Sequence, residues 1–263
     1  MKSVIFIPAR YASSRYPGKP LVELTGADGV KKSLIQRSWE AAKAVDGVDA
    51  VYVLTDDDRI RDASVAFGAD VLMTSSDARN GTERCAEGLA QLDDQPDVVV
   101  NLQGDAPLTP AWFVEDLLAA VAADEDVQMA TPVLRCDKET LTNFVTDRLN
   151  SRVGGTTAAI RPDGKALYFS KEVLPYVGSL DNPPEVWHHV GVYAYRPKAL
   201  AAYGSWPEGP LEKAEGLEQL RFLENGWPIT CVPVEGRGRV FWELNNPIDV
   251  ERIEAVLKQE GLS

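Results

Sequence analysis

Short apolar runs alternate with helical patterns along the first half of the chain. Buried strands are predicted at these runs, over residues 4–7, 50–54, 69–73, 97–102 and 127–133. Helices are predicted between them, where apolar residues recur every three or four positions, over residues 33–45, 81–92 and 110–121, and another helix begins near residues 56–58. Strands that alternate with helices form a mostly parallel sheet with helices on both faces. The pattern therefore predicts a three-layer α/β fold.

The pattern changes between residues 136 and 236, where apolar segments become shorter and turn signals more frequent. Strands are predicted over residues 156–160, 166–170 and 190–195. We interpret residues 136–236 as an extension of the sheet with a smaller, partly antiparallel lobe, which is also suited to pairing two subunits. A helix over 217–223, a strand over 229–234 and a helix over 248–259 complete a single domain, residues 1–263.

The first predicted strand leads directly into a cationic loop. This loop carries Arg10, Arg15 and Lys19, together with the hydroxyl groups of Ser13 and Ser14. An open α/β sheet binds its ligands beyond the carboxyl ends of its strands, and guanidinium and ammonium groups pair well with phosphate oxygens. The loop therefore predicts a polyphosphate site, with a solvated surface loop as the alternative. Gly18-Lys19 resembles the end of a P-loop, but residue 13 is Ser where that motif needs Gly and residue 20 is Pro where it needs Ser or Thr. The Gly-x-Gly-x-x-Gly pattern of a dinucleotide-binding loop is absent from the sequence.

Polar residues also follow other predicted strands at the same edge of the sheet. Asp105 comes just after the strand over 97–102, where a carboxylate is placed to bind Mg²⁺; the alternative is an ordinary turn residue. Residues 80–82 begin a helix and predict either contact with a base or ribose or simply a helix cap. The acids at 56–58 favour a helix start over a metal site, because carboxylates stabilise helix N-termini.

The composition limits the partners and the compartment that we expect. A formal net charge of −13 repels nucleic acid and anionic membranes, so neither is expected as a partner. The three cysteines are far apart in the sequence, which predicts neither disulfides nor a zinc site and is typical of a reducing compartment. The sequence shows neither a signal-peptide pattern nor a long apolar run, so a cytoplasmic protein is expected.

Taken together, these motifs resemble the 3-deoxy-manno-octulosonate cytidylyltransferases, which activate 3-deoxy-manno-octulosonate (Kdo) as CMP-Kdo. The resemblance runs nearly end to end and is carried by residues 7–21, 81–84, 100–105, 166–171, 189–193 and 217–221. It implies a Rossmann-like nucleotidyltransferase fold that transfers CMP from CTP to a sugar acid and releases pyrophosphate, for lipopolysaccharide or capsule synthesis. It also implies Mg²⁺ as cofactor and a homodimer formed through the smaller lobe, which binds the sugar acid.

The resemblance further implies a role for individual residues. The triphosphate would be held by Arg10, Ser13, Arg15 and Lys19. The cytidine would face Asn80, Gly81 and Arg84, while Gln103 and Asp105 would lie at the α-phosphate and the metal. The sugar acid would be held by Lys171, His189, Tyr193, Glu218 and Gln219. Arg15, Lys19 and Asp105 are the implied catalytic residues.

The chain departs from the family pattern at three places. Near the C-terminus the family usually reads Val-Asp-Thr-Pro-Glu-Asp, and Asn245 stands where its first, metal-binding Asp is expected. Ala106 replaces an acid, and residues 154–159 replace a more hydrophobic strand. The loss of two negative charges predicts weaker Mg²⁺ binding, or a ligand role shared by Asn245 with Glu243 or Asp249. A different acid or phosphonate acceptor, or a nucleotide-binding protein without turnover, therefore remain as alternatives.

The expected chemistry does not depend on a histidine or cysteine nucleophile. His188 and His189 are adjacent on a predicted strand, so their side chains point to opposite faces and at most one can reach a given site. An acceptor hydroxyl would attack the α-phosphorus in line with the departing pyrophosphate. The protein would contribute positioning and charge stabilisation, without a general base of special pKa.

Overall fold

The computed structural model describes residues 1–13, 16–153, 155–240 and 242–263. In these residues the main sheet has the order β5-β4-β1-β6-β11-β7-β10-β8-β9, and β12 pairs with β7. Its strands are β1 Ser3–Ala9, β4 Ala50–Thr55, β5 Asp70–Met73, β6 Val98–Leu102, β7 Met129–Arg135, β8 Thr156–Ile160, β9 Ala166–Ser170, β10 Trp187–His189, β11 Val192–Tyr195 and β12 Thr230–Pro233. The strands predicted from apolar runs are thereby confirmed.

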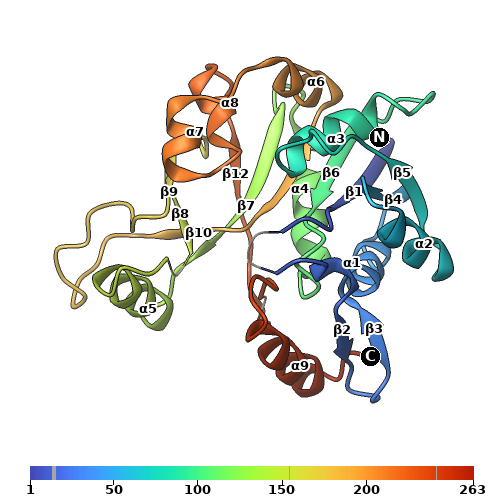
Figure 1. Ribbon diagram of the computed structural model, residues 1–263. Coiled ribbons are helices and arrows are strands. Elements are labelled where there is room, and N and C mark those ends of the chain that lie inside the picture. Colours follow the sequence, from blue (N-terminus) through green and yellow to red (C-terminus); the bar gives the residue numbers. More distant parts are fainter. Residues whose placement is uncertain (14–15, 154, 241) are drawn as a thin grey trace.

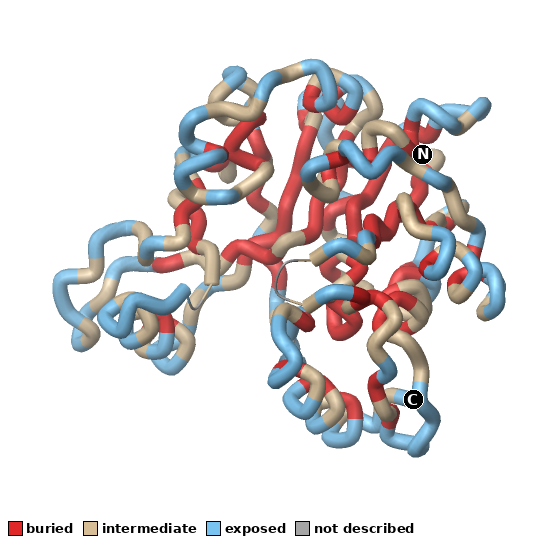
Figure 2. Tube along the Cα trace, viewed as in Figure 1, coloured by how far each residue is buried: buried red, intermediate tan, exposed pale blue. Residues whose placement is uncertain are grey.

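Helices cover both faces of this sheet (Figure 1). Their bounds are α1 Leu34–Lys43, α2 Asp58–Ala66, α3 Gly81–Leu89, α4 Ala111–Ala123, α5 Lys138–Leu149, α6 Pro197–Ser205, α7 Pro210–Glu215, α8 Leu220–Glu224 and α9 Asp249–Glu260. Alternate residues of β1 divide between two cores: Ile5 packs with α1 and α4, and Phe6 packs with α3, α6 and α8. The buried strands between exposed helix faces are visible in Figure 2. The predicted three-layer α/β fold is confirmed.

The sheet is parallel at one end and mixed at the other. β5, β4, β1 and β6 run parallel, whereas β11 lies antiparallel to both β6 and β7. The chain region predicted to form the smaller lobe continues the same sheet through antiparallel pairs of β7 with β10, β10 with β8 and β8 with β9. The insertion of β11 between β6 and β7 brings Tyr193 opposite Asn101, close to the loop that follows β6.

The C-terminal helix returns to the beginning of the chain. A small hairpin of β2 (Glu23–Thr25) and β3 (Lys31–Ser33) follows the short helix η1 (Lys19–Leu21), and α9 lies beside it (Figure 1). Leu24, Leu244 and Ile253 share a third apolar cluster, and the backbone N–H of Thr25 donates to Glu254 at 2.7 Å. This packing brings the segment before α9 back to the loop after β6.

Polar side chains define where several helices begin. Ser33 accepts the backbone N–H of Gln36, and Asp57 accepts that of Arg59. Among residues 56–58, Asp57 caps the helix and Asp58 lies in its first turn, so the predicted helix start is confirmed.

The described residues contain no helix that is both long and apolar enough to cross a membrane. Cys85 and Cys231 are buried, Cys136 is half-buried, and all three are unpaired, as predicted.

Candidate active site

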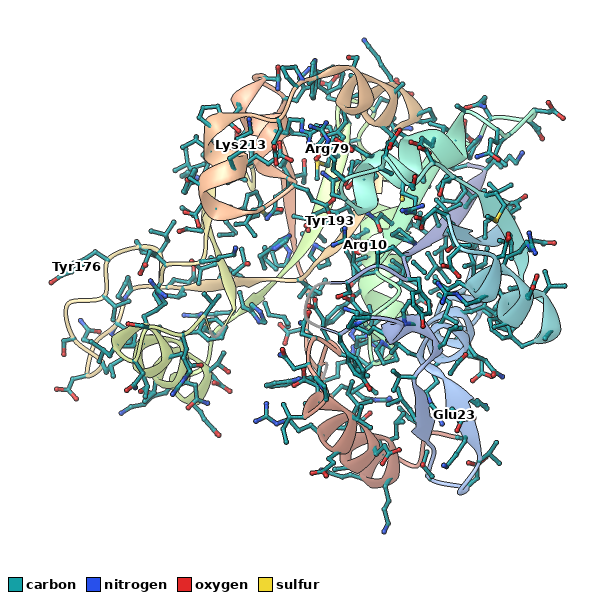
Figure 3. All side chains as sticks on the ribbon, in the orientation of Figure 1. Arg10, Glu23, Arg79, Tyr176, Tyr193 and Lys213 are labelled. Atoms are coloured by element: carbon teal, nitrogen blue, oxygen red, sulfur yellow. The ribbon has the colours of Figure 1, made fainter. Side chains whose placement is uncertain are left out.

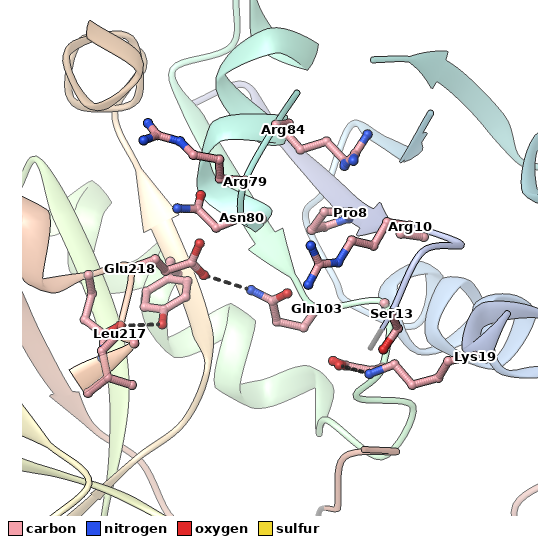
Figure 4. A pocket seen from close by; sticks show the side chains of 18 of the residues that line it. Pro8, Arg10, Ser13, Lys19, Arg79, Asn80, Arg84, Gln103, Leu217 and Glu218 are labelled. Carbon is pink, nitrogen blue, oxygen red and sulfur yellow. Dashed lines mark hydrogen bonds and ion pairs between the residues drawn. The ribbon is translucent and has the colours of Figure 1, made fainter. Parts of the chain in front are cut away.

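A cavity of about 440 Å³ opens at the carboxyl ends of β1 and β6 (Figure 4). It is lined on one side by the loop after β1 and on the other by the turn between α7 and α8. The predicted site residues among its lining are Arg10, Ser13, Lys19, Asn80, Gly81, Arg84, Gln103, Asp105, Tyr193, Glu218 and Gln219. The structure therefore gathers predicted phosphate, nucleoside and acceptor residues around one space, as Figure 3 also shows for Arg10 and Tyr193.

The loop after β1 is folded back by a glycine. Gly18 has a left-handed backbone (φ 71°) and donates its N–H to the carbonyl of Tyr11 at 2.9 Å. This contact closes the loop, and Lys19 then begins helix η1. The ammonium group of Lys19 reaches across the cavity floor to within 2.6 Å of Asp105 Oδ2. Arg15 and Ser14, predicted in the same loop, lie outside the described residues.

Asp105 is held from both sides by main-chain contacts. Ala106 N–H donates to the carbonyl of Gln103 at 3.1 Å, and Leu244 N–H donates to the carbonyl of Asp105 itself at 2.9 Å. Gly104, between Gln103 and Asp105, is glycine for a steric reason: a Cβ there would lie 2.8 Å from the carbonyl oxygen of Pro8. The loop after β6 is therefore pressed against the end of β1, which brings Asp105 to Lys19.

The N-terminus of α3 forms the side of the cavity that is predicted to face the nucleoside. Asn80 caps the helix by accepting the N–H of Glu83 at 2.9 Å and donates to the Tyr203 hydroxyl at 2.8 Å. The predicted helix cap is thus confirmed, although Asn80 also lines the cavity. A Cβ at Gly81 would come within 3.1 Å of the Gln103 amide, a tight contact that a side chain could make only if the Gln103 side chain moved slightly.

Arg84 is buried behind this helix start. It forms an ion pair with Asp56 at 3.2 Å and hydrogen bonds with Thr74. Burial lowers the pKa of the guanidinium group.

The turn between α7 and α8 forms the side of the cavity that is predicted to face the acceptor. Glu218 accepts the backbone N–H of Thr82 at 3.0 Å and the side-chain amide of Gln103 at 3.3 Å (Figure 4). Burial raises the pKa of this carboxyl group. Tyr193 donates its hydroxyl to Gln219 Oε1 at 3.2 Å. The buried Nε2 of Gln219 has no partner among the described residues, so it offers a donor to a ligand.

The helix predicted over 217–223 is wrong at its start. α8 begins at Leu220, and residues 217–219 belong to the preceding turn. The amphipathic pattern of residues 217–223 predicted Glu218 and Gln219 as helical residues. In the observed turn, both residues line the cavity. Long-range hydrogen bonds to Thr82 and Tyr193 outweigh the local helical periodicity here.

The sequence reasoning missed three charged lining residues, Arg79, Glu208 and Glu212. Glu212 lies on α7, a short helix that the sequence pattern did not reveal. The guanidinium group of Arg221 donates to both carboxylate oxygens of Glu212 at 2.6 Å and to Glu83 at 2.8 Å. The four-residue spacing of Arg79 and Glu83, whose side chains pair, was the available sequence signal.

Comparison with known proteins identifies the family. The profile of the cytidylyltransferase family matches residues 4–230. The 3-deoxy-manno-octulosonate cytidylyltransferase of Maricaulis maris (strain MCS10) is 41% identical over 261 residues, which cover 99% of both chains. The chain belongs to the 3-deoxy-manno-octulosonate cytidylyltransferase family. As a member of this family it is a nucleotidyltransferase.

Other family members agree in sequence and in structure. The mitochondrial 3-deoxy-manno-octulosonate cytidylyltransferase of Arabidopsis thaliana is 38% identical, over 98% of this chain and 83% of that protein. A solved structure of CMP:2-keto-3-deoxy-manno-octonic acid synthetase complexed with CTP is 34% identical and superposes with a TM-score of 0.85, over 99% of this chain and 100% of that one. The resemblance predicted from the motifs is confirmed.

Three residues that the family resemblance implies lie outside the cavity lining. Lys171 lies beside the lining, because its Nζ is 3.0 Å from the place of a Cβ on Gly216, which does line the cavity. His189 is buried, with Nε2 2.9 Å from the Thr131 hydroxyl, and burial lowers its pKa to about 3. The amide of Asn245 donates to Glu243 at 3.3 Å. Their roles in binding stay predictions.

The Asp105 carboxylate fits a magnesium ion that is bound together with phosphate. No cluster of three or more His, Cys, Asp or Glu side chains suited to a metal occurs in the part of the chain that the structure describes. Mg²⁺ commonly takes only one or two protein carboxylates and completes its shell with phosphate and water. Asp105 supplies one such carboxylate. Asn245 is next in the chain to Leu244, whose N–H donates to the Asp105 carbonyl. The Asp249 carboxylate instead holds the N–H groups of Asn245 and Asn246.

Proposed function

We propose that this protein transfers CMP from CTP to Kdo and releases pyrophosphate, in the synthesis of lipopolysaccharide or capsule. The observation that carries the proposal is the single cavity in which Lys19 and Asp105 face Glu218 and Gln219. A cation suited to a triphosphate and a carboxylate suited to a metal thus share one cavity with hydrogen-bonding groups suited to a hydroxylated acid. The extensive similarity to the cytidylyltransferase family supports the same reaction.

On this proposal the loop after β1 binds the triphosphate. Arg10, Ser13 and Lys19 would contact its oxygens, and Arg15 of the same loop would add a third cation. Asn80, Gly81 and Arg84 would face the cytidine, and Gln103 would lie at the α-phosphate. The positive charges would stabilise the charge that develops on pyrophosphate as it leaves, which makes Arg15 and Lys19 catalytic residues.

The acceptor would lie against the turn between α7 and α8. Glu218 would accept hydrogen bonds from its hydroxyl groups and Gln219 Nε2 would donate one, while Tyr193 would keep Gln219 in place. Lys171 at the rim would pair with the carboxylate, and His189 would support Tyr193, whose ring lies 5.6 Å away. This arrangement would hold one acceptor hydroxyl in line with the α-phosphorus.

Mg²⁺ is the proposed cofactor, held by Asp105 with Asn245, and when bound it supplies positive charge to the phosphate oxygens. The chain's own residues would do the remaining work by orientation. Among the described residues, the cavity lining includes neither histidine nor cysteine. As the new O–P bond forms and the bond to pyrophosphate breaks, the acceptor hydroxyl would pass its proton to water, without a general base of special pKa.

Pyrophosphate release is the direct test of this function. CTP, Kdo and Mg²⁺ should yield pyrophosphate and CMP-Kdo, identified by mass, whereas omission of Kdo should abolish release. Asn245→Asp, assayed in parallel, should be active and should need less Mg²⁺, because it restores a carboxylate. If the wild type released no pyrophosphate with Kdo but did so with another acid or a phosphonate, that compound and not Kdo would be the acceptor. CTP binding without turnover on any acceptor would indicate a binding protein.

We also propose a cytoplasmic homodimer that pairs through residues 136–236. Support comes from exposed apolar side chains of this region, Leu149 at 82%, Leu167 at 62% and Tyr176 at 88% exposure; Tyr176 lies at its outer tip in Figure 3. Analytical ultracentrifugation should give twice the chain mass, and Leu149→Asp should shift it to the single-chain mass. A wild-type protein of single-chain mass at assay concentrations would contradict the dimer.

A further inference from the structure

Lys19 and Asp105 form a close ion pair at the floor of the cavity. The ammonium nitrogen lies 2.6 Å from Asp105 Oδ2, and the two side chains are 14% and 27% exposed. Both residues line the cavity, so the pair lies where phosphate and metal are proposed to bind. The carboxylate proposed to hold a metal is thus already neutralised by a cation of the protein itself.

The backbone around the pair is held in place. Gly18 and Leu21 fix the start of η1 through the 2.9 Å contacts of Gly18 N–H with Tyr11 and of Leu21 N–H with Gly18. Asp105 is held through its carbonyl by Leu244. The movable part is the Lys19 side chain, a flexible four-carbon stem with a compact charge. Its ammonium group is therefore free to exchange one anionic partner for another while the backbone remains where it is.

We propose that Lys19 is the resident counter-ion of Asp105 and keeps divalent metal off this carboxylate until a nucleoside triphosphate draws the ammonium group away. The inference rests on the proposed function only in assuming that a triphosphate binds this cavity. A single carboxylate without a cluster of further acids binds a hard dication weakly, and an ammonium group in contact with it repels a second cation. A triphosphate offers Lys19 more negative charge, and Asp105 is then released to the metal.

The exchange makes metal and nucleotide bind cooperatively. Each ligand favours the state in which the ion pair is open, so each must strengthen the binding of the other by the same factor. Metal bound without nucleotide would have to displace Lys19 into water. The ion pair therefore gives an order to the binding steps that the cavity shape alone does not impose.

Mn²⁺ binding to the nucleotide-free protein tests this directly. Free Mn²⁺ is measured by electron paramagnetic resonance for the wild type, Lys19→Met and Lys19→Gln. Both neutral variants should bind Mn²⁺ at least about tenfold more tightly than the wild type, a lower bound from the strength of contact ion pairs. Lys19→Arg keeps the charge and should remain like the wild type. Adding Asp105→Asn to Lys19→Met should remove the gain.

Lys32 offers a matched control, because its ammonium pairs with Glu40 at 2.9 Å with similar exposure, 20% and 33%. Lys32→Met removes the ammonium group from a carboxylate outside the cavity, which still accepts the Gln36 amide at 3.1 Å, and should leave Mn²⁺ binding unchanged. Equal affinities of the wild type, Lys19→Met and Lys19→Gln would overturn the proposal, as would a gain that survives Asp105→Asn. The measurement needs neither acceptor nor turnover, so failure of CMP transfer to Kdo and failure of the counter-ion exchange are distinguishable.

Discussion

Gln103 donates its side-chain amide to Glu218 at 3.3 Å, across the width of the cavity. Gln103 follows β6, whereas Glu218 lies in the turn between α7 and α8, so this contact joins elements that are 115 residues apart in the chain. The same carboxylate accepts the N–H of Thr82 at the start of α3. Glu218 is therefore where the proposed nucleotide side and acceptor side of the cavity meet.

Glu218→Gln should impair use of the acceptor more than binding of CTP. The substitution keeps the size of the side chain but removes the charge, and it sets an amide against the Gln103 amide. Hydrogen bonds to charged groups contribute about 1.5–3 kcal/mol, so kcat/KM for the acceptor should fall roughly 10- to 100-fold. Steady-state kinetics with CTP and Kdo, beside calorimetric CTP binding, measure both quantities.

Glu254→Gln is the matched control for that variant. Glu254 also accepts a backbone N–H, that of Thr25, but lies on α9 away from the cavity lining. Its kinetics should equal those of the wild type. A larger loss of CTP affinity than of acceptor use in Glu218→Gln would contradict the position given to Glu218.

His188, which is half-buried, and His189, which is buried, should make stability depend on pH below neutrality. Burial lowers the pKa of His188 to about 4 and of His189 to about 3, from 6.5. As the pH falls below 6.5, both histidines become protonated in the unfolded chain but stay neutral in the folded protein. The free energy of unfolding therefore falls. The loss is about 1.4 kcal/mol per pH unit for each histidine between roughly pH 6 and pH 4.

Urea unfolding between pH 5 and 7 measures this slope. His189→Gln retains a hydrogen-bonding group near Thr131 and should reduce the slope by the contribution of one histidine. Replacing both histidines should remove the contributions of both. If the slope of the wild type persists in the double variant, the two neutral histidines are not its source.

Gly18→Ala should disturb the phosphate loop. The left-handed backbone of Gly18 disfavours a side chain by about 1–2 kcal/mol, and its Cβ would lie 3.0 Å from the Tyr11 ring. Displacement of Lys19 should weaken CTP binding by about tenfold. Gly29→Ala is the control, since Gly29 is also left-handed (φ 81°) but has open space around it. It should cost similar stability with unchanged CTP binding; equal loss of affinity in both variants would refute the argument.

Arg221→Leu should destabilise the fold strongly. The guanidinium group is fully buried between Glu212 and Glu83, and removal leaves the Glu212 carboxylate buried without its ion partner. Breaking a buried pair in this way costs about 3–5 kcal/mol. Adding Glu212→Leu should restore a good part of the stability, because the unpaired charge is then gone. Thermal and urea unfolding of the single and double variants check both effects; a double variant less stable than Arg221→Leu would contradict this account.

The sequence by itself determined the local elements and the edge of the sheet at which the chemistry lies. The strands over 156–160 and 166–170 have the predicted bounds, and Ser33, the first residue of the helix predicted over 33–45, caps α1. Arg10, Lys19 and Asp105 could be placed together because the carboxyl ends of parallel strands share one edge. These features depend on propensity, periodicity and capping, which act over a few residues.

Only the tertiary structure decided how distant segments complete the cavity. β11 inserts between β6 and β7, α7 brings Glu212 to Arg221, and residues 217–219 form a turn instead of the predicted helix. The contact of Lys19 with Asp105 likewise joins residues 86 apart. Such contacts arise from burial, backbone pairing and charge neutralisation between segments that the linear pattern does not relate, because local patterns contain no information on which distant partner a group will meet.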